Sequence, residues 1–151
     1  MKQQFDFSVR ALVLILAFLC LQSFTTNSGG DYYKVLLNGR LVAEQYLTKP
    51  VALKALSLNA ATHDDKLTVY YSHCGQVGKN RTITIRKENG KILKEWKFSD
   101  SPSQQMQVAV DEILAAASKQ TSVSLYYASN EIRSGRQLIE LNLSTVAMAR
   151  R

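Results

Sequence analysis

Two Asn-Gly pairs, Asn38–Gly39 and Asn89–Gly90, constrain the fold of this 151-residue chain more than any other feature. Both residues of such a pair tolerate positive φ, which the two central positions of a type I′ turn require. Apolar-rich runs flank the first pair, and the expected strands are about Tyr32–Leu37 and Arg40–Leu47. Two tight turns of this kind predict antiparallel hairpins, and therefore a domain built mainly from β-strands.

Short apolar runs continue this pattern along the chain, and we expect about eight strands in all. Beyond the first hairpin the expected strands are Val51–Leu58, Leu67–Ser72, Arg81–Lys87, Lys91–Phe98, Val123–Ala128 and Gln137–Val146. The alternation falters near Ala55, which a β-bulge, a strand that changes sheets or a short amphipathic helix would each explain. In the sixth strand we expect Ile92, Trp96 and Phe98 to be buried.

One amphipathic helix is predicted at about residues 102–118. Ser101 is a suitable N-cap, Pro102 fits the first helical position, and Gln104 completes a capping box. Apolar residues then recur at helical spacing and form one stripe for a sheet to cover: Met106, Val110, Ile113, Leu114 and Ala117. Strands and one helix together predict an antiparallel β-sandwich or partly open barrel. The alternative is an α+β arrangement in which the helix packs on an antiparallel sheet.

The N-terminal segment differs from the rest of the chain. Lys2 and Arg10 flank a short polar start, Ala11–Leu21 is wholly apolar, and the residues that follow are small and polar. This order is typical of a secretory signal peptide, and the apolar run is about half of the roughly 20 residues that span a bilayer. We therefore expect residues 1–28 to be a cleaved signal peptide. The protein is then secreted or periplasmic and meets the membrane only through this segment.

What remains is expected to form a single β-rich domain, residues 31–146, followed by a frayed basic tail at 147–151. The formal charge of the chain is +7, and it is +6 without Lys2, Arg10 and Asp6 of the signal peptide. Cations spread along a chain favour solubility and permit weak attraction to anionic lipid headgroups, polysaccharides or acidic proteins. Export argues against nucleic acid as the partner. We expect instead a protein, a glycan or an anionic component of the cell envelope.

Leu67–Ile85 and Val123–Leu141 match each other when they are aligned without gaps. Tyr70–Tyr71 of the first segment falls on Tyr126–Tyr127 of the second. Each segment consists of an apolar strand, a polar loop with Gly and cations, and another apolar strand. We interpret this echo as two similar β-hairpins, which is a matter of architecture rather than of chemistry.

His63, His73 and Cys74 are the strong soft-metal ligands that follow the predicted signal peptide. A β-sandwich that holds copper through histidine and thiolate is a known kind of site. His73 and Cys74 can share one ion only if the backbone turns between them, because adjacent residues of a strand point to opposite faces, and Gly75 permits such a turn. No C-x-x-C or H-x-x-x-H spacing is present. A metal or redox protein that binds copper or zinc is therefore the alternative function.

A catalytic role is not expected. Once the signal peptide is removed, Cys74 has no disulfide partner within the chain. Its thiol would need a neighbouring cation, such as Lys79, to become a nucleophile, and no third group that would orient it is identifiable. The sequence also lacks a G-x-S-x-G motif and a metalloprotease helix.

Cations and tyrosines are the candidate contact residues. The loops of the two echoed segments carry four cations: Lys79, Arg81, Arg133 and Arg136. If the loops are neighbours, these side chains gather into a loose anion site; otherwise they are ordinary solvated charges. Tyr70 and Tyr126 lie on the face of their strands opposite the apolar residues. An open face would let both rings stack against a carbohydrate or a protein, whereas a helix on that face would make them core.

The sequence thus predicts an exported, non-catalytic binding or structural domain that acts in the cell envelope or outside the cell. Its expected contact residues are Tyr70, Tyr126, Lys79, Arg81, Arg133 and Arg136. Its ligand is not specified by any motif.

Overall fold

The computed structural model describes residues 30–47, 52–58, 65–100 and 104–143. Within these ranges the chain forms nine strands and one helix, and no helix there is long and apolar enough to span a membrane. The elements are β1 (Tyr32–Leu37), β2 (Arg40–Tyr46), β3 (Lys54–Leu58), β4 (Lys66–Ser72), β5 (Arg81–Arg86), β6 (Ile92–Phe98), β7 (Gln105–Ala109), α2 (Val110–Ala116), β8 (Ser122–Ala128) and β9 (Arg136–Leu143). The predicted signal peptide and tail, and also His63, Ser101 and Pro102, lie outside the described residues.

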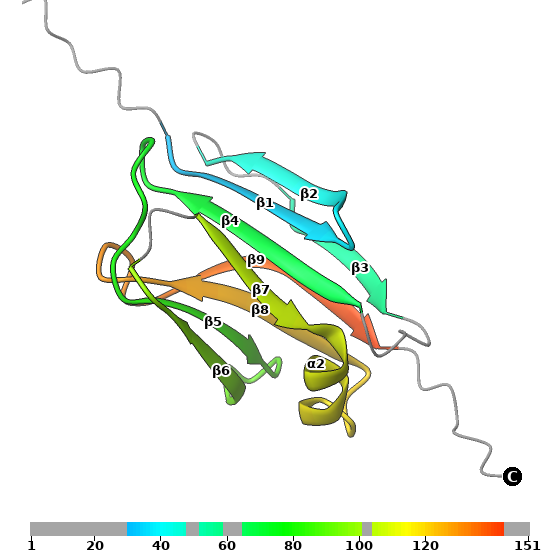
Figure 1. Cartoon of the computed structure of the whole chain (residues 1–151). Helices are drawn as coiled ribbons and strands as arrows, with labels where there is room; N and C mark the ends of the chain where they lie inside the picture. The colour runs from blue at the N-terminus through cyan, green and yellow to red at the C-terminus, as the bar shows by residue number, and fades with distance from the viewer. Residues whose placement is uncertain (1–29, 48–51, 59–64, 101–103, 144–151) are drawn as a thin grey trace, which may run out of the picture.

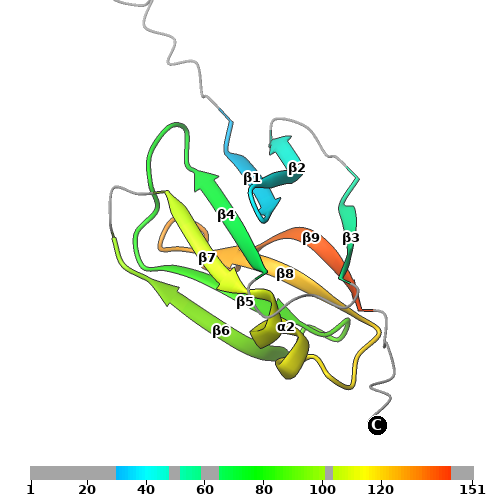
Figure 2. The same cartoon turned by 45° about the vertical axis from the view of Figure 1, so that its right-hand side comes forward.

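The strands form two sheets that face each other (Figure 1). The strand order is β2-β1-β4-β7 in the four-stranded sheet A and β3-β9-β8-β5-β6 in the five-stranded sheet B. Neighbouring strands are antiparallel except β3 and β9, which are parallel, so sheet B is mixed. α2 contacts β7 of sheet A and β6 of sheet B at one end of the sandwich (Figure 2). The predicted β-sandwich with a single helix is therefore confirmed.

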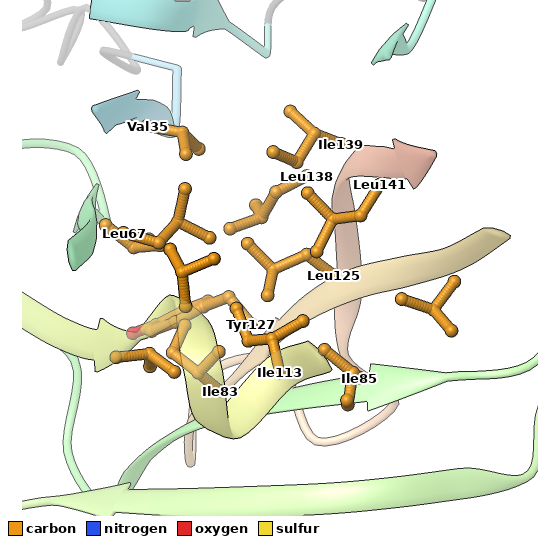
Figure 3. Close-up of a cluster of buried hydrophobic side chains, with 14 of the residues drawn as sticks. Val35, Leu67, Ile83, Ile85, Ile113, Leu125, Tyr127, Leu138, Ile139 and Leu141 are labelled. Atoms are coloured by element: carbon orange, nitrogen blue, oxygen red, sulfur yellow. The ribbon is translucent and has the colours of Figure 1, made fainter. Parts of the chain in front are cut away.

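The core lies between the sheets and follows directly from the alternation along each strand. Leu67, Val69 and Tyr71 of β4 are fully buried, and the residues between them face the other side of sheet A. Figure 3 shows Val35 and Leu67 from sheet A gathered with Leu125 from sheet B. Burying one such aliphatic side chain contributes about 1.5–3 kcal/mol, so the two apolar inner faces drive the sheets together.

The predicted helix over residues 102–118 is wrong in its first half. The structure has strand β7 there, and only α2 is helical. Met106, Val108 and Val110 are all buried, so a period of two fits this stretch as well as the helical spacing does. As a strand it also gives β4 a hydrogen-bonded neighbour, which satisfies backbone groups that a helix would leave at the sheet edge. The N-cap of α2 is Ala109, without a side-chain hydrogen bond, so the predicted capping box does not start this helix.

Ile92, which was predicted to be buried, is 48% exposed. The pairing of β5 with β6 is irregular between Ile85 and Arg86. An extra residue at such a bulge turns the next side chain to the opposite face of the sheet. Ile92 therefore lies beside Arg86 on the outer face, whereas Lys94 aligns with the buried Ile85 and Trp96 shares the face of Lys94.

Glu112 ties α2 to β6. Its carboxylate accepts a hydrogen bond from Trp96 Nε1 at 2.7 Å and lies 2.6 Å from Lys94 Nζ. The hydrogen bonds from Lys94 and Trp96 hold the pKa of Glu112 below its ordinary value. The helix is thus anchored through groups on the inner face of β6, beside the core.

We expect the fluorescence of Trp96, the single tryptophan of the chain, to report protonation of Glu112. The pKa of Glu112 is lower in the folded protein than in the unfolded chain, where it is about 4.3. The contact therefore stabilises the fold fully at pH values above ~4.3, and this stabilisation is lost as the pH falls through the folded-state pKa. Emission should change with a midpoint below pH ~4.3 while far-UV circular dichroism stays constant. Glu112→Gln should abolish the transition; an unchanged transition in that variant would contradict this role of Glu112.

The two echoed segments are not two similar hairpins. β8 and β9 do form the expected hairpin. β4 and β5, however, belong to different sheets, because β4 pairs with β1 and β7 whereas β5 pairs with β6 and β8. Residues 73–80 therefore cross from sheet A to sheet B, and we call this segment the arch.

Candidate functional site

The arch and the loop between β8 and β9 contact each other at one end of the sandwich. This second loop, residues 129–135, is called the hairpin loop. The backbone N–H of Asn130 donates to the carbonyl of Lys79 at 2.9 Å. The N–H of Lys79 in turn donates to the Glu131 carboxylate at 3.1 Å. The two loops that echo each other in the sequence are therefore neighbours in space.

His73 lies where these loops meet, and four polar groups surround its ring. Its Nε2 atom is 3.1 Å from the Tyr127 hydroxyl and 3.1 Å from Ser129 Oγ. Its Nδ1 atom is 3.4 Å from Asp31 Oδ2, and Glu131 lies 3.9 Å from Nε2. The side chain is only 11% exposed. We call these five residues the His73 cluster; it joins β4, the segment before β1, and the β8–β9 hairpin.

Ser129, His73 and Asp31 have the connectivity of a serine hydrolase triad, but their surroundings favour a structural role. Burial raises the pKa of Glu131, yet hydrogen bonds from the Ser129 hydroxyl and from the backbone N–H groups of Glu131 and Lys79 outweigh it and lower that pKa. Ser129 thus has a carboxylate beside it as well as the His73 ring. Ser129 is also only 5% exposed, so a substrate carbonyl has little access to it. The cluster fastens one sheet to the other.

Three buried tyrosines continue the His73 cluster into the core. The ring of Tyr71 stacks on Tyr127 with centroids 4.1 Å apart and on Tyr33 with centroids 6.4 Å apart. The Tyr71 hydroxyl donates to Asp31 at 2.9 Å, and the Tyr33 hydroxyl donates to the carbonyl of Leu138 at 2.7 Å. Burial raises the pKa of all three phenols. The stack therefore joins β1 and β4 of sheet A to β8 and β9 of sheet B.

Cys74 and His73 both lie beside Asp31 but differ in their exposure to solvent. Cys74 and Gly75 occupy the centre of a tight turn with φ of 51° and 90°, and the thiol is exposed. The His73 ring is instead enclosed within its cluster. Cys74 Sγ lies 3.9 Å from Asp31 Oδ1. No three His, Cys, Asp or Glu side chains in the described ranges are arranged to hold a metal ion, and His63 lies outside those ranges.

The four loop cations are not equivalent. Arg81 is 2% exposed, and its Nη2 donates to the carbonyl of Ser99 at 2.6 Å. Its guanidinium belongs to the interior and is not available to a ligand. Lys79, Arg133 and Arg136 are exposed, and Arg136 also interacts with the Tyr71 hydroxyl, so an anion site at these loops has at most three of the four expected cations.

Tyr70 and Tyr126 lie on the outer faces of different sheets. Each is half-buried and alternates with buried residues of β4 or β8. The main contacts of α2 are with the edge strands β7 and β6 rather than with β4 or β8. The two rings are therefore not core, yet they cannot touch one ligand together. Tyr126 is also covered by the guanidinium of Arg86, 4.2 Å from its ring centroid, and its hydroxyl donates to Gln137 at 3.1 Å.

Tyr70 belongs to a group that sequence reasoning missed. Tyr32 and Tyr46 are paired across β1 and β2, with ring centroids 4.6 Å apart, and Tyr46 is 65% exposed. Lys34 Nζ lies 5.7 Å from the Tyr32 centroid and 5.6 Å from the Tyr70 centroid. We call Tyr32, Lys34, Tyr46 and Tyr70 the tyrosine face; it is part of the outer surface of sheet A.

The phenol of Tyr32 is held by Glu44, the residue opposite Lys34 on β2. The Tyr32 hydroxyl donates to the Glu44 carboxylate. Partial burial, together with this hydrogen bond and the charge of Glu44, raises the pKa of Tyr32 to about 12. The Glu44 carboxylate thus accepts a hydrogen bond from Tyr32, although Glu44 pairs with Lys34 across the strands. The Lys34 ammonium lies over the rings of Tyr32 and Tyr70 instead.

Comparison with known proteins adds no function. No family model matches the chain, and no curated protein matches it either. The His73 cluster and the tyrosine face are the two features of the structure that bear on function.

Proposed function

We propose that this protein is an exported, non-catalytic binding domain that acts in the cell envelope or outside the cell and binds a glycan on its tyrosine face. The observation that carries the proposal is the grouping of three tyrosine rings and one lysine on a sheet surface that α2 does not cover. The predicted signal peptide at residues 1–28 supports export.

A glycan suits this surface for chemical reasons. The C–H face of a sugar ring packs on an aromatic ring, and its hydroxyl groups pair with amides and hydroxyls. Gln105 and Gln107 of β7 are exposed and share the outer face of sheet A with Tyr70, which pairs directly with Gln105. Tyr46 offers the most accessible ring. Tyrosine loses little conformational freedom on binding because it has only two side-chain torsions.

The His73 cluster supports a non-catalytic domain rather than an enzyme or a metal protein. Its ring and hydroxyl groups are satisfied by one another and largely shielded from solvent. The alternative of a copper or zinc site at His73 and Cys74 would need both side chains on one ion. His73 is enclosed and Cys74 is exposed, which favours the binding domain.

We expect Tyr46→Ala and Tyr70→Ala each to weaken binding of the purified protein to a polysaccharide about tenfold, which is ~1.4 kcal/mol. The measurement is co-sedimentation with insoluble cellulose, chitin and cross-linked polygalacturonate. Tyr126→Ala, on the outer face of sheet B, is the matched control and should bind as the unmodified protein does. Loss of binding in Tyr126→Ala alone would place the ligand on sheet B and contradict the proposal.

A further inference from the structure

Lys34 is the charged member of the tyrosine face, and it has no carboxylate partner among the described residues. Lys94 and Lys97 of β6 both form ion pairs with glutamates, whereas no described ion pair includes Lys34. Glu44 lies opposite Lys34 in the strand pairing but accepts its hydrogen bond from Tyr32. The Lys34 ammonium instead lies over the rings of Tyr32 and Tyr70.

Two aromatic rings hold this ammonium in place without neutralising it. A cation over a ring is attracted to the π electrons by about 0.5–1 kcal/mol at an exposed site, and it keeps its full positive charge. Its N–H groups that point away from the rings remain donors for an anionic group. Hydrogen bonds from a charged donor to a charged acceptor are roughly twice as strong as neutral ones. The tyrosine face therefore offers aromatic rings on which a ligand can stack, and it holds one positive charge, that of Lys34, between them.

We infer that the glycan is an acidic polysaccharide, with a sugar carboxylate on Lys34 and sugar rings against Tyr46 and Tyr70. This inference rests on the glycan-binding function proposed above. Without the predicted signal peptide the chain carries a formal charge of +6, which attracts a polyanion over a longer range. Complementary charge thus guides the polymer to the protein, and Lys34 positions it on the tyrosine face.

An anionic membrane fits the same surface less well. Binding to lipid headgroups typically uses a cluster of roughly 4–8 lysines and arginines beside one another. The tyrosine face has one lysine among aromatic rings. A single lysine flanked by tyrosine rings suits a polymer in which each sugar ring carries one carboxylate, because the rings can stack while a carboxylate reaches the lysine.

The test compares two polymers with the same sugar backbone, one charged and one neutral: soluble polygalacturonate and its fully methyl-esterified form. Affinity is measured by calorimetry for the unmodified protein, Lys34→Met and Lys97→Met. Lys97 is 81% exposed on β6 of sheet B, so its replacement changes net charge equally at a distant surface. We expect Lys34→Met to weaken binding to polygalacturonate about tenfold, and Lys97→Met to leave it nearly unchanged. The esterified polymer should bind more weakly and should not distinguish Lys34→Met from the unmodified protein.

Other outcomes overturn the inference in separable ways. Equal losses in Lys34→Met and Lys97→Met would mean non-specific attraction of a polyanion. Equal affinity for both polymers, with Tyr46→Ala still weakening both, would remove the acidic ligand but leave the glycan-binding function standing. Equal or tighter, Lys34-dependent binding to phosphatidylglycerol vesicles would assign the face to a membrane. No effect of Tyr46→Ala on any ligand would remove both the inference and the proposed function.

Discussion

Replacing Gly78 with alanine is expected to destabilise the fold by about 3 kcal/mol, although the change adds a single methyl group. A Cβ atom at Gly78 would lie 2.3 Å from the Tyr127 hydroxyl, 2.9 Å from His73 Nε2 and 3.0 Å from Glu131 Oε2. Tyr127 is fully buried and stacked on Tyr71, so its ring has no free space to move into. The methyl group therefore pushes apart the contacts that join the arch to the hairpin loop.

A double-mutant cycle isolates the cause of this loss. Tyr127→Phe removes the oxygen that the new Cβ would meet, so Gly78→Ala should cost about 1–2 kcal/mol less in that background. Gly39→Ala is a matched control, since its φ of +79° strains an alanine but no atom lies within 4 Å of its Cβ. Urea unfolding followed by circular dichroism gives the four free energies. A Gly78→Ala protein as stable as the unmodified one would show that the His73 cluster does not hold the loops together.

Much of the fold could be predicted because its determinants are local. The Asn38–Gly39 turn and the apolar-rich runs that flank it specify β1 and β2 within a residue or two of their observed ends. The stretch from Met106 to Val110 could not be assigned locally, since its apolar spacing suits a strand and a helix alike. Pairing with β4, which is distant in the sequence, determines that this stretch forms strand β7.

The same limit explains why the tyrosine face was missed. In a two-residue hairpin Leu37 pairs with Arg40, and an unbroken register would then place Tyr32 opposite Gln45. The register shifts by one residue beside Val35, and this shift brings Tyr46 opposite Tyr32. No turn signal or propensity in the sequence marks that bulge, so the grouping of the rings appears only in three dimensions.

The candidate loops were found from the sequence, but their connection was not. The echo of the two segments left open whether their loops are neighbours, and the structure shows that they meet. It could not distinguish an arch from a hairpin, because both read as strand, polar loop and strand. The partners of His73 come from position 31 and from positions 127–131, and such long-range contacts leave no local pattern.

Alkaline pH is expected to unfold the protein through its stacked tyrosines. Burial raises the folded-state pKa of Tyr33, Tyr71 and Tyr127, whereas in the unfolded chain each ionises near pH ~10. A raised folded-state pKa means that the stabilisation is fully present below pH ~10 and is lost as pH rises toward the folded values. Each phenol contributes a slope of about 1.4 kcal/mol per pH unit in that window, and three contribute ~4 kcal/mol per unit.

A loss of ~4 kcal/mol per pH unit is large compared with the free energy of unfolding of a typical domain, which is about 5–15 kcal/mol. Tyrosinate absorbance and circular dichroism should therefore change together in one cooperative step above pH ~10. Tyr71→Phe removes one of the three phenols, so the free energy of unfolding should fall with pH about one third less steeply. If all of the tyrosines titrated gradually while the strands stayed intact, the stack would be open to solvent, and the joint between sheets A and B would have to lie elsewhere.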